Sequence, residues 1–120
     1  MTTEECYQKL GGNYSEVLGR MMKQDFIEKF MKKFLEDDSY SLLCDAMEAQ
    51  NRAEAFRAAH TLKGVCQNLG FGTLASSSSR LTEILRPQAD VIPPQANEAM
   101  KEVTDNYNTT TQIIREYFQL

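Results

Sequence analysis

The chain has 120 residues, of which 42% are hydrophobic and 25% are charged, as is typical of one soluble globular domain. Its 17 acidic and 13 basic residues give a net charge of −4. Because nucleic-acid affinity depends on clustered lysine and arginine, this balance argues against a nucleic-acid partner. No apolar run approaches the roughly 20 residues that a membrane span needs. We therefore predict a single domain over residues 1–120 with no membrane partner.

The cysteines predict a reducing environment. Cys6, Cys44 and Cys66 are odd in number and lack C-x-x-C spacing, and the chain begins without a secretory signal. This pattern is typical of free thiols in a cytoplasmic protein. Cys66 stands among apolar neighbours, which predicts a packing role.

Apolar residues recur at three- and four-residue spacing, which predicts helices rather than strands. Thr3–Glu5 opens a short helix that the glycines at 11–12 end. Asn13 and Glu16 form a capping pair for a second short helix, in which each side chain satisfies an amide. A longer helix follows up to about residues 37–38. Its expected apolar face consists of Phe26, Ile27, Phe30, Met31 and Phe34.

Further helices are predicted on either side of residue 60. Ser39 or Ser41 is expected to cap a helix that buries Leu43, Cys44 and Met47. Asn51 and Glu54 repeat the capping pair and start a helix that ends at Gly70, where Phe71 closes the terminus.

Two more helices complete the predicted fold. One spans about residues 73–85 with a seam of Leu74, Ser78, Leu81 and Leu85, and its serine run at 76–79 indicates close packing rather than a linker. Pro87, Pro93 and Pro94 mark a loop. The last helix, from about Gln95, has the seam Ala96, Met100, Val103, Tyr107, Thr110, Ile114 and Tyr117. Short connections favour antiparallel neighbours, so the predicted fold is all-α: an antiparallel up-and-down four-helix bundle with the short N-terminal helices packed as a cap.

His60 is the single histidine of the chain and lies in the helix that starts at Asn51. At about 100° per residue, Phe56, Lys63, Gly64 and Gln67 fall within about 60° of it. The apolar residues of this helix fall near the opposite pole, and they are Ala55, Ala58, Leu62, Cys66 and Leu69. We therefore expect His60 to point away from the core.

A solvated helix face with an incidental histidine is the alternative interpretation, and two neighbours argue against it. The ammonium group of Lys63, one turn away, can approach an anion attached to the ring. Gly64 costs a helix about 1 kcal/mol relative to alanine, so its benefit must lie elsewhere. The missing side chain clears an approach to His60 for another surface.

The run His60-Thr61-Leu62-Lys63-Gly64 resembles the H-x-L-K-G signature of histidine-containing phosphotransfer (HPt) domains. Ala58-Ala59 before it and Leu69-Gly70 after it extend the resemblance, which covers most of the chain. Domains of that family are antiparallel four-helix bundles of about this length. The resemblance implies that His60 accepts a phosphoryl group at Nε2 from a receiver-domain aspartate, or from a histidine kinase, and passes it to another receiver aspartate.

The resemblance also implies roles for residues near His60. Lys63 would steady the phosphate charge, and Phe56, Gly64 and Gln67 would form the docking face. On the following helix, Thr82 or Glu83 would orient the ring. The expected protein is a monomeric carrier rather than an enzyme, with no cofactor or metal of its own. Its expected partners are response-regulator receiver domains and a hybrid sensor histidine kinase.

Other functional classes fit the sequence less well. A helical adaptor without phosphorylation would keep the core periodicity but would not need His60, Lys63 and Gly64 together. A histidine-kinase dimerisation domain usually has an acidic residue and a proline where this chain has Thr61 and Val65. A metal or haem site is disfavoured because a single histidine has no matching ligand set.

Overall fold

The computed structural model describes residues 1–86 and 89–120, and every regular element within them is an α-helix. The all-α prediction is therefore confirmed, while the predicted breaker Pro87 lies outside the described residues. The helices in chain order are α1 (Thr3–Lys9), α2 (Tyr14–Met21), α3 (Gln24–Phe34), α4 (Ser39–Glu48), α5 (Arg52–Leu69), α6 (Gly72–Leu85) and α7 (Gln95–Phe118).

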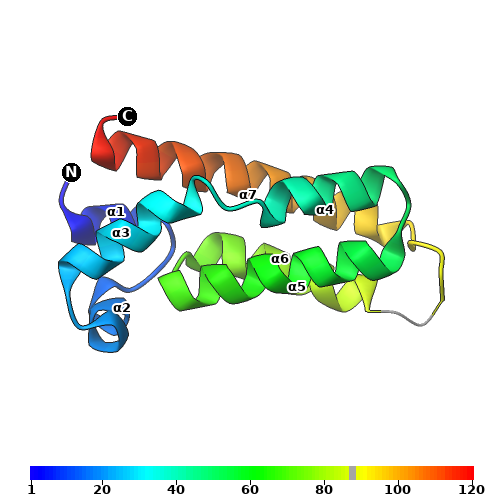
Figure 1. Ribbon diagram of the computed structural model, residues 1–120, viewed down its shortest axis with the longest axis horizontal. Helices are drawn as coiled ribbons and strands as arrows, with labels where there is room; N and C mark the ends of the chain where they lie inside the picture. The colour runs from blue at the N-terminus through cyan, green and yellow to red at the C-terminus, as the bar shows by residue number, and fades with distance from the viewer. Residues whose placement is uncertain (87–88) are drawn as a thin grey trace.

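The helices lie along an elongated molecule with principal extents of 44, 26 and 19 Å. Figure 1 shows α4, α5, α6 and α7 running along the long axis, with α1, α2 and α3 gathered at the end where both termini lie. Helix α5 packs between α4 and α6, and α6 packs against α7. Within the described residues, no helix combines the length and apolar character needed to cross a membrane.

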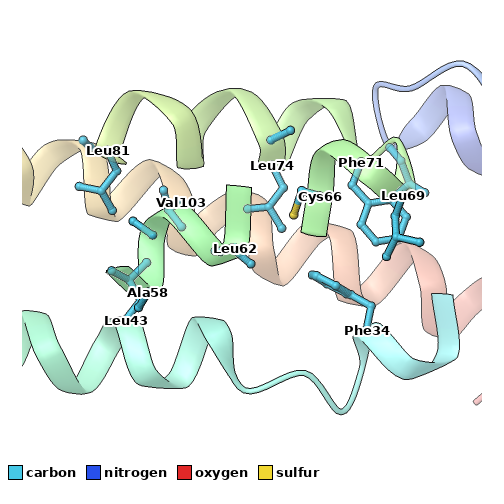
Figure 2. Packing of buried hydrophobic residues seen from close by; sticks show 14 of the residues in the cluster. Phe34, Leu43, Ala58, Leu62, Cys66, Leu69, Phe71, Leu74, Leu81 and Val103 are labelled. Atoms are coloured by element: carbon cyan, nitrogen blue, oxygen red, sulfur yellow. The ribbon is translucent and has the colours of Figure 1, made fainter. Parts of the chain in front are cut away.

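The core follows one face of α5. Figure 2 shows Leu62 and Cys66 of α5 in one cluster with Leu43 of α4, Leu74 of α6 and Val103 of α7. The five apolar residues predicted for the inner face of α5 are all buried, at 8% exposure or less: Ala55, Ala58, Leu62, Cys66 and Leu69. The predicted rotational phase of this helix is therefore confirmed.

Two cysteines, Cys6 and Cys66, are part of this core, whereas Cys44, which was also predicted to be buried, is only half-buried. Burial raises the pKa of the Cys66 thiol to about 12 and that of Cys6 to about 11. Both thiols therefore stay protonated at neutral pH and pack as small apolar groups, as predicted for Cys66.

The apolar face predicted for α3 is wrong in part. Ile27, Met31 and Phe34 are buried, but Phe26 and Phe30 are 46% and 41% exposed. The buried residues follow the i, i+4, i+7 spacing of one narrow helix face, whereas the two exposed rings lie about 100° to its side. Five apolar residues at adjacent positions cannot all face the core of a helix that is packed on one side.

Helix α5 ends as predicted. Gly70 adopts φ +75°, and the Phe71 N–H donates to the Cys66 carbonyl oxygen at 2.9 Å, which closes the terminus with a buried Phe71. The N-terminal segment packs closely against this turn, because a Cβ placed at Gly12 would clash with the Gly70 carbonyl oxygen. A side chain at Gly12 would therefore push this end of the molecule apart.

The predicted helix starts are only partly confirmed. The Asn13 and Asn51 side chains accept the Glu16 and Glu54 N–H groups, at 3.3 and 3.1 Å. The Glu54 carboxylate, however, pairs with Arg57 instead of completing a reciprocal cap. Helix α4 also starts differently: Asp38 is its N-cap and the Ser39 N–H donates to an Asp37 carboxylate oxygen. The Asp37 carboxylate therefore accepts an amide hydrogen bond at the helix start, where a serine side chain was expected to accept it.

The serine run lies inside α6, as predicted, and one of its hydroxyls carries a stability prediction. Ser78 is fully buried, and its Oγ has no hydrogen-bond partner among the described residues. Ser78→Ala is expected to raise the free energy of unfolding by about 1 kcal/mol, because it removes an unsatisfied buried hydroxyl and favours helix. Chemical denaturation measures this change, and Ser76→Ala at an exposed position of the same run is the control. A loss of stability in Ser78→Ala would show that the hydroxyl is satisfied.

Candidate functional site

Helix α5 holds His60 at mid-length on its outer face. The helix starts at the Asn51 cap and ends at Gly70, and the face opposite His60 is buried in the core. His60 itself is exposed, as the helical phase predicted. The imidazole therefore stands on a rigid element whose packing does not involve the ring.

Phe56 lies beside His60, one turn earlier. The two rings are nearly parallel, at 9°, with centroids 6.0 Å apart, and Phe56 is half-buried. The guanidinium of Arg86, just beyond the end of α6, lies 5.3 Å from the Phe56 ring centroid. The Phe56 ring therefore lies close to both the imidazole of His60 and the guanidinium of Arg86.

The surface on the other side of His60 is open. No atom of residues 1–86 or 89–120 outside the neighbouring backbone lies within 4 Å of a Cβ placed at Gly64. Lys63 is half-buried and Gln67 is exposed. Gly64 therefore forms no close packing contact with another helix, and the space beside the imidazole is free for a partner.

The two ring-orienting candidates on α6 lie in different environments. Thr82 is fully buried, and its hydroxyl donates to the Ser78 carbonyl oxygen at 2.6 Å. Glu83 is exposed and accepts two hydrogen bonds from Arg86, at 2.9 and 3.2 Å. Of the two, Glu83 lies on the accessible side of α6.

The pKa of the Glu83 carboxyl is influenced by charges on both α6 and α5. The hydrogen bonds and charge of Arg86 lower the pKa of the Glu83 carboxyl, and the charges of Lys63 and His60 lower it further. Glu83 is thus a carboxylate at neutral pH. Its role in orienting the ring stays a prediction.

The contacts of two arginines, Arg86 and Arg52, were not predicted from the sequence. Arg86 follows Glu83 by three residues, a spacing that indicates an ion pair on one helix face. Arg52 gave no such signal, because its guanidinium donates to four carbonyl oxygens more than 30 residues away, those of Ile84, Leu85, Arg86 and Val91. This contact fastens the end of α6 to the start of α5.

The arrangement suits transfer of an anionic group. A neutral imidazole has a ring nitrogen with a lone pair that can attack phosphorus, and Lys63 supplies a positive charge one turn away. The open surface at Gly64 lets a second protein approach the ring. Such a site presents an exposed nucleophile on a helix surface.

Comparison with known families decides the assignment. A family model described as Hpt domain matches residues 24–110, which include α3 to α6 and the first part of α7. The chain belongs to the Hpt domain family. Neither the curated proteins nor the solved structures contain a significant match.

Membership in the Hpt family defines the general role of the chain. Hpt domains are phosphotransfer carriers in two-component phosphorelays, and they interact with receiver domains and histidine kinases. The resemblance predicted from the run His60–Gly64 is confirmed. The run lies within the matched range, on the outer face of α5.

Proposed function

We propose that His60 is the phospho-acceptor of this Hpt domain. The observation that carries the proposal is the exposed imidazole on α5 beside the open surface at Gly64, in a chain whose family transfers phosphoryl groups. Nε2 attacks the phosphorus of a receiver aspartyl phosphate, so that an N–P bond forms while the P–O bond to the aspartate breaks. The aspartate leaves as a carboxylate, and the reverse step phosphorylates a second receiver.

The neighbouring residues support this exchange. Lys63 balances the charge of the phosphoryl group on the ring, and Glu83 accepts the Nδ1–H so that Nε2 faces the partner. Phe56, Gly64 and Gln67 form the docking face. The receiver contributes the phosphorylated aspartate and its Mg²⁺, so the chain acts as a relay without turnover of its own.

We propose further that residues 1–120 form a single monomeric domain. The packing order α4, α5, α6, α7 and the position of α1, α2 and α3 at one end support an antiparallel four-helix bundle with an N-terminal cap. The partners are response-regulator receivers and a hybrid sensor histidine kinase. The cytoplasmic location expected from the three cysteines stays a prediction.

One experiment separates the relay from a helical adaptor that is never phosphorylated. The chain is incubated with each receiver of the same cell after that receiver has been phosphorylated with acetyl phosphate and Mg²⁺. A relay takes up acid-labile, base-stable label from at least one receiver within minutes. An adaptor binds without taking up label.

Lys63→Ala is expected to keep the fold and to weaken the phosphorylated state. Without the ammonium group, phosphoryl transfer to His60 should slow and the phosphohistidine should hydrolyse sooner, because no cation balances its charge. Transfer rates and the half-life of the phosphorylated chain measure both effects. Lys63→Arg, which keeps the charge, is the control. Unchanged kinetics in Lys63→Ala would show that Lys63 is an ordinary solvated lysine.

Variants at Gly64 are expected to separate stability from transfer. Gly64→Ala should raise the free energy of unfolding by up to about 1 kcal/mol, because alanine favours helix and its Cβ meets open space. Transfer should be kept or slightly slowed. Gly64→Gln should fold at least as well as the parent yet transfer far more slowly, since its side chain stands in the path of the receiver.

Thermal melts and receiver-to-His60 transfer rates on the parent and both variants test this expectation. Stability that rises while transfer falls supports an open docking face. If Gly64→Gln transfers at the parent rate, Gly64 has no docking role. If Gly64→Gln unfolds, Gly64 is a packing contact.

A further inference from the structure

Arg52, the first residue of α5, binds the end of α6 through its guanidinium group. Its Nε donates to the Leu85 carbonyl oxygen at 3.2 Å, and its Nη2 donates to those of Ile84 and Arg86 at 3.2 and 2.9 Å. Its Nη1 donates to the Val91 carbonyl oxygen at 2.6 Å. The side chain is half-buried. The start of α5 and the end of α6 lie at the end of the molecule opposite both termini (Figure 1). All three guanidinium nitrogens therefore join the two helices there.

The last turn of α6 depends on this contact for hydrogen-bond donors. Carbonyl groups at the C-terminal end of a helix have no partner within the helix, and a cation there is stabilising because it opposes the helix dipole. Helix α6 has no basic residue in its own last turn. The Arg86 guanidinium, just beyond that turn, pairs with the Glu83 carboxylate. Arg52 therefore supplies donors and charge that hold the end of α6 in place.

The same end of α6 carries the side chains that reach the His60 face. The Glu83 carboxylate accepts hydrogen bonds from Arg86 at 2.9 and 3.2 Å. The Arg86 guanidinium lies 5.3 Å from the Phe56 ring centroid, and the Phe56 ring lies nearly parallel to the His60 imidazole. A row of neighbouring side chains thus leads from Glu83 on α6 to His60 on α5. The position of this row depends on where α6 ends.

Arg52 can influence the His60 face without touching it. Arg52, Phe56 and His60 follow one another at four-residue spacing, so they lie along one side of α5. His60 is eight residues from Arg52, about 12 Å along the helix axis. Helix side chains also lean toward the N-terminus, which points the guanidinium away from His60. An effect of Arg52 on phosphotransfer must therefore pass through the end of α6.

We propose that Arg52 is a positioning residue of the phosphotransfer site, which fixes the end of α6 so that Glu83 can accept the Nδ1–H of His60. The proposal rests on the proposed function, in which His60 is the phospho-acceptor and Glu83 is the partner of its ring. A neutral imidazole carries a proton on one nitrogen and a lone pair on the other, and the hydrogen bond made by one nitrogen decides this choice. Arg52 thereby keeps the lone pair on Nε2, the atom that attacks phosphorus. If the end of α6 is loosened, the ring takes both tautomers and fewer rings are ready to react.

Two variants of Arg52 and one control test this role. Arg52→Gln removes the charge and most of the donors, whereas Arg52→Lys keeps the charge but has one ammonium group for four carbonyl oxygens. The matched control is Arg80→Gln, which removes a different contact of α6. The Arg80 guanidinium pairs with the Glu102 carboxylate of α7 at 2.6 Å on the exposed surface. Thermal melts define a temperature at which the variants are folded. If Arg52→Gln does not fold, Arg52→Lys is used for the same comparisons.

The first measurement is transfer from the receiver that phosphorylates the parent chain fastest, over a range of receiver concentrations. Arg52→Gln is expected to lower the saturated transfer rate by about tenfold, because small displacements of groups around a reacting atom cost roughly one to two orders of magnitude. Arg52→Lys should lie between this variant and the parent. The dissociation constant of the receiver should stay within about twofold, since the docking residues Phe56, Gly64 and Gln67 are unchanged. Arg80→Gln should keep both values.

The second measurement is the position of the proton on the His60 ring. His60 is the single histidine of the chain, so nitrogen NMR of its ring gives signals from one residue only. Spectra recorded at alkaline pH distinguish a proton on Nδ1 from one on Nε2. The parent and Arg80→Gln should carry it mainly on Nδ1, whereas Arg52→Gln and Glu83→Ala should share it between both nitrogens. A merely structural role of Arg52 would lower the melting temperature without moving these signals.

The double variant of Arg52→Gln and Glu83→Ala tests whether Arg52 acts through Glu83. It should transfer phosphoryl groups as slowly as Glu83→Ala alone, because both changes remove the same interaction. A further tenfold loss in the double variant would overturn the proposal. Parent-like ring signals and a parent-like transfer rate in Arg52→Gln would also overturn it, and would leave the relay intact.

Phosphoramidate, a small-molecule phosphoryl donor, distinguishes failure of this proposal from failure of the proposed function. If Glu83→Ala keeps the ring signals and the transfer rate of the parent while phosphoramidate still labels His60, neither Glu83 nor Arg52 positions the ring. That result overturns the proposal and leaves His60 as the acceptor. A parent chain that neither the receiver nor phosphoramidate labels overturns the relay itself.

Discussion

A chain carrying His60→Gln is expected to fold as the parent does and to accept no phosphoryl group. Glutamine has no nitrogen nucleophile that can form the N–P bond, and His60 is exposed, so its loss leaves the core unchanged. The free energy of unfolding should stay within about 0.5 kcal/mol of the parent. Incubation with a phosphorylated receiver and with phosphoramidate measures the loss, and thermal melts verify the fold.

Arg57→Gln is the matched control for this result. Arg57 lies on the same helix, three residues before His60, and its side chain is 70% exposed. It should accept label at the parent level. Acid-labile label that persists in His60→Gln would place the acceptor elsewhere, and a large loss of thermal stability would show that the ring is part of the packing.

Leu62→Ala is expected to have the opposite effect on the same helix. Leu62 is fully buried and lies in the core cluster (Figure 2). Truncation of a buried leucine costs about 2–5 kcal/mol, a large part of the stability of a small domain. The folded fraction should still transfer phosphoryl groups at a nearly normal rate, because Leu62 faces away from His60.

Thr61→Ala is the control for Leu62→Ala. Thr61 is the exposed neighbour, and its hydroxyl donates to the Arg57 carbonyl oxygen on the surface of α5. Its loss should change stability by at most about 0.5 kcal/mol. Denaturant unfolding compares the two variants. An equally small change for Leu62→Ala would contradict the orientation of α5 and, with it, the exposure of His60.

The sequence was sufficient for the long helices because their apolar seams extend over several turns. Helices α5 and α6 bury the predicted residues. The predicted α7 seam is buried at Ala96, Val103, Thr110 and Ile114, whereas its other members, Met100, Tyr107 and Tyr117, are half-buried. For α3 the pattern was ambiguous, since five apolar residues occupy a wide arc and only packing decides which of them face inward. Phe26 and Phe30 turn outward because α3 covers one side of the molecule only.

The sequence predicted the end of α5 but not the start of α4. The positive φ at Gly70 requires a residue without Cβ strain, so the end of α5 was predictable from the chain. The start of α4 was not, because Asp37, Asp38, Ser39 and Ser41 can all accept an amide hydrogen bond. The choice of Asp37 as acceptor depends on the path of the loop from α3.

At the candidate site, some features follow from the sequence and others depend on tertiary packing. His60, Lys63 and Gly64 lie at fixed offsets on one helix, so their common face follows from helical geometry alone. The environment on α6 does not, because it depends on how α6 rotates against α5. That rotation buries Thr82 and exposes Glu83. The contact of Arg52 with the end of α6 is equally a product of tertiary packing, with no trace in local sequence.

Localisation of the phosphoryl group on the parent chain tests the central claim most directly. The protein is phosphorylated by a receiver, kept at alkaline pH, and analysed by fragmentation mass spectrometry and phosphorus NMR. We predict one phosphoryl group per chain, on Nε2 of His60, that is lost in acid and recovered on a second receiver. A phosphoryl group on any other residue, or acid-stable label, would contradict the assignment of His60 as the relay histidine.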